Sequence, residues 1–186
     1  MAGEEVSHDG LVSVDRARLW TLPDTVPKLV GAAVSVDTAR WCAGWADGLI
    51  TVNAPRETLV RIVDAYRDSG GRGPVNLQVH LSWAPDEDEA AHIAHDQWRS
   101  NVFAPPVCWD LETAEHFDAV SEHVTARQVA QVVNVSADPG RHAAWLQEYA
   151  ELGFEGIYLH HVGQELDRFI DVFGAKVLPQ LAEGPR

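Results

Sequence analysis

Short apolar runs alternate with amphipathic stretches along most of this chain. Between Lys28 and Asn53 two apolar, β-branched runs flank a stretch with helical periodicity, which is typical of two buried strands joined by a helix. Ser35 and Asp37 predict where that helix starts, because their side chains can accept its first free N–H groups. The same alternation recurs further on. It predicts strands at Leu29–Val34, Gly48–Val52, Asn76–Ser82 and Gly156–His160.

The segments that follow these strands predict helices. Leu59, Ile62, Val63 and Tyr66 recur near the 3.6-residue period and give one stretch an apolar face. Asp138 and Pro139 are a strong start signal for a later helix, as an N-cap residue followed by proline at the first helical position. The predicted helices are Pro55–Ser69, Asp86–Arg99, Ala114–Val124, Thr125–Ala130, Gly140–Leu152 and Gln164–Val177, and a short extended piece is expected at Val132–Val135.

The N-terminal part has a different pattern. Val6–Val14 holds two short alternating runs around the pair Asp9-Gly10, which predicts a β-hairpin, and Arg16–Pro27 reads as a connector. We therefore expect a single domain over residues 1–186, with hairpin and connector in 1–27 and four βα units in 28–186. Four consecutive βα units fit a small open α/β sheet or one half of an eight-unit barrel, and the pattern alone does not decide between them.

Charge and composition limit the classes of molecule that this chain is expected to bind and its expected cellular location. The chain has 28 acidic and 14 basic residues, a formal net charge of −14, which argues against nucleic acid and anionic membranes as partners. It has neither an apolar run of roughly 20 residues nor the basic and apolar start of a secretion signal, so a cytoplasmic location is expected. Cys42 and Cys108 lack CxxC spacing and fit reduced thiols better than a disulfide.

Several longer strings resemble a known family. RARLWTLP, DTARW, WADGLITV, QVHLSWAPDEDEA, AHDQW and GFEGIYLHHVG, spread between Glu4 and Leu181, are similar to the C-terminal part of luciferase-like monooxygenases, nearest to the branch of non-F420 flavinoid oxidoreductases. The resemblance implies an α/β fold: a β-hairpin followed by (βα)4, strands five to eight of a TIM barrel, without the first four units. It also implies an oxidoreductase that uses FMN or coenzyme F420 for hydride or oxygen chemistry on a small organic substrate.

The resemblance places the phosphate end of the cofactor after the first parallel strand. The small residues Ala32 and Ala33 leave room there, next to a helix N-terminus that favours anions. The alternative explanation for these small residues is that they only allow the strand and the helix to pack closely, with no ligand. Val34 and Ser35 stand where relatives commonly have Ser and Gly. The cofactor-binding candidates are therefore Ala32, Ala33, Val34 and Ser35.

Substrate candidates are residues at the C-terminal ends of the strands, where barrel active sites lie. Alternation along the last strand points only one of His160 and His161 into a barrel. The alternative to a substrate-binding role is a position in the hydrophobic core for Trp83. For Asn53 the alternative is a turn in which its side chain hydrogen-bonds its own backbone. His116 lies where sugar-phosphate-oxidising relatives carry Lys beside His, but Glu115 replaces that Lys, so a sugar phosphate is not expected. The set is Asn53, Trp83, His116, His160 and His161.

The remaining expectations concern what the chain lacks. No catalytic residue is assigned, because the family's ring-binding residues belong mostly to the absent units. No metal site is expected, and His92 and His95 read as helix surface. The partners expected are a small-molecule substrate and either a second copy or a separate N-terminal half, because a half-barrel leaves two open sheet edges. The alternative function is a truncated, catalytically inactive half-barrel that acts as an assembly or binding module.

Overall fold

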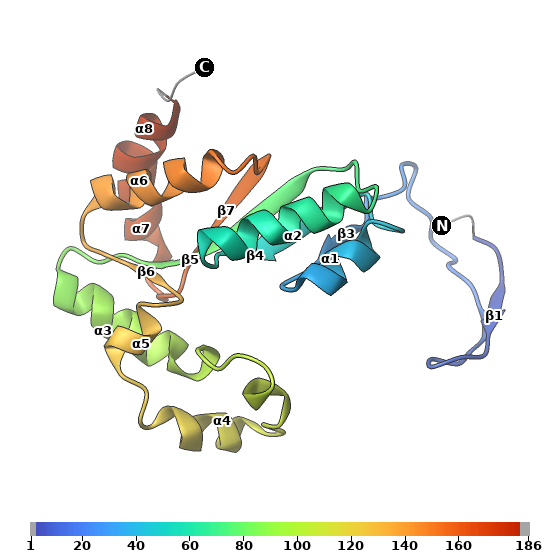
Figure 1. Ribbon diagram of the computed structural model, residues 1–186, viewed down its shortest axis with the longest axis horizontal. Coiled ribbons are helices and arrows are strands. Elements are labelled where there is room, and N and C mark those ends of the chain that lie inside the picture. Colours follow the sequence, from blue (N-terminus) through green and yellow to red (C-terminus); the bar gives the residue numbers. More distant parts are fainter. Residues whose placement is uncertain (1–2, 183–186) are drawn as a thin grey trace.

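Helices pack against a mostly parallel β-sheet in the computed structural model, which describes residues 3–182 (Figure 1). The strands β3 (Val30–Ala32), β4 (Gly48–Val52), β5 (Val75–Ser82) and β7 (Gly156–His161) lie next to one another in chain order, and each is parallel to its neighbour. The predicted α/β class is confirmed. Short β6 (Asn134–Val135) pairs with the end of β5 and accounts for the predicted extended piece.

The first parallel strand is shorter than the predicted Leu29–Val34. A side chain fixes the residue that precedes this strand. The carboxylate of Asp47 accepts the backbone N–H of Leu29 at 2.8 Å, in place of a carbonyl group of a neighbouring strand. Beyond Ala32 only one more ladder contact forms, from the N–H of Ala33 to the carbonyl of Ile50, before Ser35 caps the following helix. The other three strands begin and end within one residue of their predicted bounds.

The two faces of the sheet differ. In β5, Val75, Leu77, Val79 and Leu81 are at most 1% exposed and pack into the main core, while the alternate residues Asn76, Gln78 and His80 are less buried. That core also takes residues from α1 (Val36–Cys42), α2 (Arg56–Asp68), α6 (Pro139–Ala150) and α7 (Leu166–Val172). The helices of the core therefore cover one face. We call the opposite face the open face; it carries Val30, Ala32, Ile50, Val52, Asn76, Gln78, His80, Tyr158 and His160.

A smaller apolar cluster lies beside the end of β5. Val124, Val129 and Val133 are buried there with Ala94 and Val162. The elements between β5 and β6 are α3 (Glu87–Trp98), 3₁₀ turns at Arg99–Asn101 and Val107–Trp109, α4 (Ala114–Ser121) and α5 (Ala126–Val129). At the other end of the chain, α7 continues through a π-helical turn (Phe173–Val177) into α8 (Leu178–Ala182). Across residues 3–182, every helix is too short or too polar to cross a bilayer.

The predicted N-terminal hairpin is present, with a longer loop than expected. β1 (Val6–His8) pairs antiparallel with β2 (Val14–Ala17), so the turn is not the two-residue Asp9-Gly10 type and the second strand begins where the prediction ended it. The hydroxyl of Ser13 donates to the carboxylate of Asp9 across the loop at 3.0 Å. Figure 1 shows the hairpin lying apart from the parallel sheet.

One carboxylate joins the start of the last strand to the rest of the sheet. Glu155, immediately before β7, accepts the backbone N–H of Val75 at 2.7 Å and a guanidinium N–H of Arg67 at 3.0 Å. The pairing of β5 with β7 then runs from Asn76 and Gly156 to Leu81 and His161. Glu155 thereby sets the register that brings polar residues of the two strands together.

Candidate functional site

Polar and aromatic side chains gather on the open face toward the C-terminal ends of β5 and β7. The parallel register places His80 beside His160 and Gln78 beside Tyr158. Because side chains alternate between the two faces of a strand, these four residues project to the same side. The sheet thus brings together residues that lie about half the chain apart in sequence.

Gln78 connects the two histidines. Its amide nitrogen is 3.2 Å from Nε2 of His80 and 3.2 Å from Nδ1 of His160. An amide N–H only donates, so both ring nitrogens accept, and a neutral ring then carries its proton on the other nitrogen. Nδ1 of His80 and Nε2 of His160 are therefore the proton donors of this pair.

Trp98, the last residue of α3, closes the cluster on one side. Its ring centroid lies 4.7 Å from that of His80 and 5.2 Å from that of His160, and the two imidazoles are 5.2 Å apart. Burial, and to a smaller extent the neighbouring His160, lowers the pKa of His80 to about 4. His80 is consequently neutral at physiological pH, and the cluster contains no permanently charged side chain.

Asn53 has a structural position at the edge of this cluster. Its side-chain oxygen accepts the backbone N–H of His80 at 2.9 Å, and its amide nitrogen donates to the carbonyl of Val132 at 3.3 Å. Its backbone N–H donates to the carbonyl of Gln78. Asn53 therefore fixes the end of β4 against β5, and a substrate contact through its side chain stays a prediction.

The structure separates the two adjacent histidines. His160 lies on the open face, whereas His161 lies on the helix-covered face, 6% exposed, with its ring stacked on Phe169 at 4.6 Å. Burial lowers the pKa of His161, although the nearby carbonyl of Leu81 acts in the opposite direction. The expectation that only one of them points to the strands' open side is met, and His160 is that residue.

Trp83 and His116 do not join the cluster. Trp83 is 7% exposed in the main core, and its indole N–H donates to the carbonyl of Ala137 at 3.0 Å, so the structure gives it the core position that was its alternative. His116 is exposed in the first turn of α4, which Figure 1 shows well away from the parallel sheet. A substrate contact by Trp83 or His116 stays a prediction, and neither residue lies in the cluster around His160.

The candidate phosphate cradle is only partly suited to a phosphate. Ser35 already accepts the backbone N–H of Thr38 at 3.2 Å and lies 2.9 Å from its hydroxyl, so the Ser35 hydroxyl is occupied as a helix cap. Val34 is 68% exposed, and the Asp37 carboxylate in the first turn adds a negative charge. What remains for an anion is the space beside Ala32 and the free amides of the first turn of α1.

Gln78, His80 and Trp98 were not among the residues singled out from the sequence. The strict alternation VNLQVHLS was a usable signal for the first two, because it places Gln78 and His80 on the less apolar face of a strand. No comparable signal exists for Trp98. Its place depends on where α3 ends relative to β5.

Comparisons with known proteins agree with this architecture. The sequence profile of the family described as luciferase-like monooxygenase matches residues 1–156. F420-dependent glucose-6-phosphate dehydrogenases from Nakamurella multipartita and Microbacterium testaceum are 27% and 26% identical over 96% and 97% of this chain. In both cases the match covers 56% of the relative, so this chain spans just over half the length of these relatives.

Solved structures show the same fold at lower identity. An F420-dependent secondary alcohol dehydrogenase in complex with an F420-acetone adduct superposes with a TM-score of 0.80 at 19% identity, covering 97% of this chain and 57% of that one. The coenzyme F420-dependent tetrahydromethanopterin reductase from Methanopyrus kandleri gives 0.66 at 17% identity, covering 95% and 58%. Since the family profile matches most of the sequence, the chain belongs to the luciferase-like monooxygenase family.

Proposed function

We propose that this chain forms one wall of an F420- or flavin-dependent oxidoreductase, with the open face as its substrate-binding surface. The observation that carries this proposal is the cluster of Gln78, His80, His160 and Trp98 at the C-terminal ends of β5 and β7. In folds built from parallel βα units, this end of the sheet is where ligands bind. The F420-dependent relatives favour F420, and a Baeyer-Villiger monooxygenase in complex with FMN among the similar structures keeps FMN as the second choice.

The residues of the chain itself suit a substrate that carries a hydroxyl or a carbonyl group. A bound F420 or flavin supplies hydride transfer. Nε2–H of His160 donates a hydrogen bond to the substrate oxygen, and Gln78 holds this tautomer through Nδ1. His80 stays neutral beside it, so no positive charge competes for the position. Trp98 shields the two imidazoles from water on one side.

The substrate we propose is an uncharged alcohol or ketone. The cluster offers hydrogen-bond donors and aromatic surface and has no Lys or Arg to pair with a phosphate. Glu115 lies on α4, away from the cluster, but it stands where the resemblance implies a Lys in sugar-phosphate-oxidising relatives, which also argues against a sugar phosphate. A secondary alcohol, as in the name of the structural neighbour with TM-score 0.80, agrees with this chemistry.

We further propose that the sheet is half of a (βα)8 barrel that is completed by four more βα units. Four parallel strands in chain order, with the helices of the core on one side, are the repeating geometry of such a barrel. The open face would then be the inner wall, and the second wall would supply the other side of the cofactor site. That wall comes from a second copy or from an N-terminal half, so the 186-residue chain alone is expected to bind F420 or FMN weakly.

The test is complementation. The chain is mixed with the part of the Nakamurella multipartita relative that it does not match, and F420 reduction is followed by the loss of its visible absorbance. We expect turnover of 2-propanol and none of glucose 6-phosphate. Titration of the chain alone with F420 and FMN should show only weak binding.

Matched variants distinguish a loss of activity at the proposed site from a general loss of folding. His160→Ala and Gln78→Ala should lower turnover by about 10²-fold or more, the usual size of a lost general acid–base or donor contribution. Asp64→Asn, on the exposed side of α2, is the control and should leave the rate unchanged. Full activity of His160→Ala, or turnover of glucose 6-phosphate in preference to the alcohol, would contradict the proposal.

A further inference from the structure

The two edges of the parallel sheet carry large apolar side chains that remain exposed. Figure 1 shows α1, beside β3, and α7, beside β7, at opposite ends of the sheet. At the β3 edge, Trp41 and Trp45 of α1 are 66% and 44% exposed and contact each other, with ring centroids 5.1 Å apart. An exposed tryptophan pair next to an unpaired strand forms the kind of apolar patch that marks an interaction surface.

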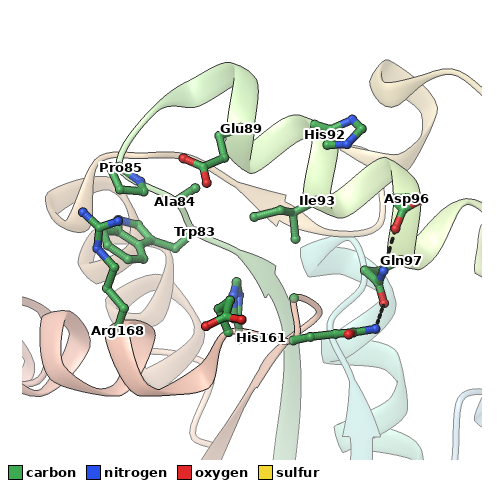
Figure 2. Close-up of a pocket in the computed structure, with 13 residues that line it drawn as sticks. Trp83, Ala84, Pro85, Glu89, His92, Ile93, Asp96, Gln97, His161 and Arg168 are labelled. Carbon is green, nitrogen blue, oxygen red and sulfur yellow. Dashed lines mark hydrogen bonds between the residues drawn. The ribbon is translucent and has the colours of Figure 1, made fainter.

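The β7 edge carries an apolar stripe along α7 and α8. Two neighbouring residues of α7 turn inward: Phe169 packs in the main core, and Arg168 lies over Trp83, 5.9 Å from its ring centroid (Figure 2). The outward side carries the exposed apolar residues Leu166, Ile170 and Leu178. In a right-handed βα unit the helix packs toward the next strand, so this stripe lies on the side where a further strand would pair with β7.

Barrel geometry fixes how these two edges would meet. The residues that lie level across the four strands are the register partners Ala32, Ile50, Asn76 and Gly156. A (βα)8 barrel has a shear of about eight residues, so a two-fold ring of two such halves shifts its register by about four residues at each junction. Gly156 of one copy then pairs with Lys28 of the other. The opposite shift would pair it with Val36, which lies inside α1.

This register places Tyr158 opposite Val30 and His160 opposite Ala32. All four residues lie on the open face, so the side chains of the two strands alternate in phase. The backbone agrees, because Ala33 donates its N–H to β4 and the N–H and C=O groups of Ala32 therefore face the free edge. The two edges are thus complementary to each other.

We propose that two copies of this chain close an eight-stranded ring about a two-fold axis, with β3 of each copy parallel to β7 of the other and the α7 stripe packed on the tryptophan pair. The proposal rests on the half-barrel of the proposed function and names a second copy as the other wall. The space beside Ala32 of one copy then lies next to His160 of the other, so each of the two sites in the ring takes residues from both copies.

The exposed apolar surface is large enough for such a dimer. Large side chains at these exposures present roughly 900 Å² per copy at the two edges, whereas a specific interface buries about 800 Å² per partner. They belong to Leu29, Val30, Val34, Trp41, Trp45, Tyr158, Leu166, Ile170 and Leu178. The net charge of −14 on each copy opposes association, so added salt should strengthen the dimer.

Sedimentation equilibrium and disulfide crosslinking test the proposal without cofactor or substrate. We expect a dimer that is tighter in about 0.5 M than in about 0.05 M NaCl. In a Cys108→Ser background, Val30→Cys and Tyr158→Cys proteins are mixed and oxidised. They should form a linked dimer, because paired Cα atoms of neighbouring strands are about 5 Å apart. Val30→Cys mixed with His160→Cys is the control, since a two-residue offset exceeds the disulfide range of about 7 Å.

A matched pair of charge insertions tests the helix contact. Ile170→Asp places a carboxylate in the α7 stripe and should weaken the dimer by about 100-fold or more, because the charge would be buried without a partner. Leu11→Asp makes the same change in the hairpin loop, at a residue that is 108% exposed, and should leave the dimer unchanged. Circular dichroism melts verify that both variants are folded.

The outcomes separate this assembly from the proposed activity. A wild-type monomer or open-ended polymer would overturn the dimer, and so would equal crosslinking of Val30→Cys with His160→Cys and with Tyr158→Cys. A monomer that gains turnover only with the unmatched part of the relative would refute the dimer while supporting the proposed function. A crosslinked dimer in the expected register, with no turnover in any mixture, would support the dimer and count against the proposed function.

Discussion

His80 should make the stability of this protein fall in mild acid. Its pKa is lowered from 6.5 to about 4 in the folded chain, so below about pH 6.5 the unfolded chain takes up a proton that the folded chain does not. Protonation therefore favours unfolding. The stability from this group is fully present above about pH 6.5 and is lost as the pH falls toward about 4.

The size of the effect follows from the shift. A change from 6.5 to about 4 corresponds to at most about 3 to 4 kcal/mol. His80 is only partly buried, so solvent screening reduces this figure, and we expect about 1 to 2 kcal/mol between about pH 7.5 and about pH 5. Burial also lowers the pKa values of His142 and His161, so these two groups act in the same direction as His80.

The assay is urea unfolding of the wild type and of His80→Gln at both pH values. The shared titrations cancel in the difference between the two proteins, so the excess stability of the wild type should shrink by that 1 to 2 kcal/mol at the lower pH. An NMR titration of the imidazole carbon-bound protons gives the pKa of His80 directly. A difference that is independent of pH, or a His80 that titrates near 6.5, would refute the argument.

Three further predictions concern packing and association. Gly31→Ala should destabilise the fold by about 1 to 3 kcal/mol, because the added carbon would lie 2.6 Å from Sγ of Cys42, while Gly44→Ala, with only a backbone oxygen at 3.5 Å, should be tolerated. Leu77→Ala, at a fully buried position, should lose about 2 to 5 kcal/mol in urea unfolding, whereas Tyr158→Ala, 56% exposed on the open face, should lose less than about 1 kcal/mol. The chain alone should self-associate in sedimentation velocity, because β3 and β7 each have one unpaired edge in the described sheet, and a stable monomer at micromolar concentration would contradict this.

The strands were predictable because their signal is local. Each apolar run ends at a turn or cap residue, and the alternation in β5 separates core residues such as Leu77 from open-face residues such as Gln78. The shortened β3 was not predictable, since it depends on the carboxylate of Asp47, 18 positions further along the chain. Local propensity contains no information on such a contact.

The candidate site was predictable only in part, for a similar reason. Alternation shows that one of His160 and His161 faces the open side, but the choice depends on the register between β7 and β5. Trp98 reaches both imidazoles because α3 ends above them, which is a consequence of helix packing.

The contacts of Glu155 bear on the order in which the chain folds. Most strands of the sheet pair with the next strand along the chain across a short connection, but Val75 and Glu155 are 80 residues apart. Closing that long loop costs more chain entropy than closing the short ones, so β3, β4 and β5 with α1 and α2 should form first and β7 should join late. Loss of the Glu155 carboxylate should therefore speed unfolding more than it slows folding. Until β7 arrives, the edge of β5 that carries half of the histidine pair remains open to solvent.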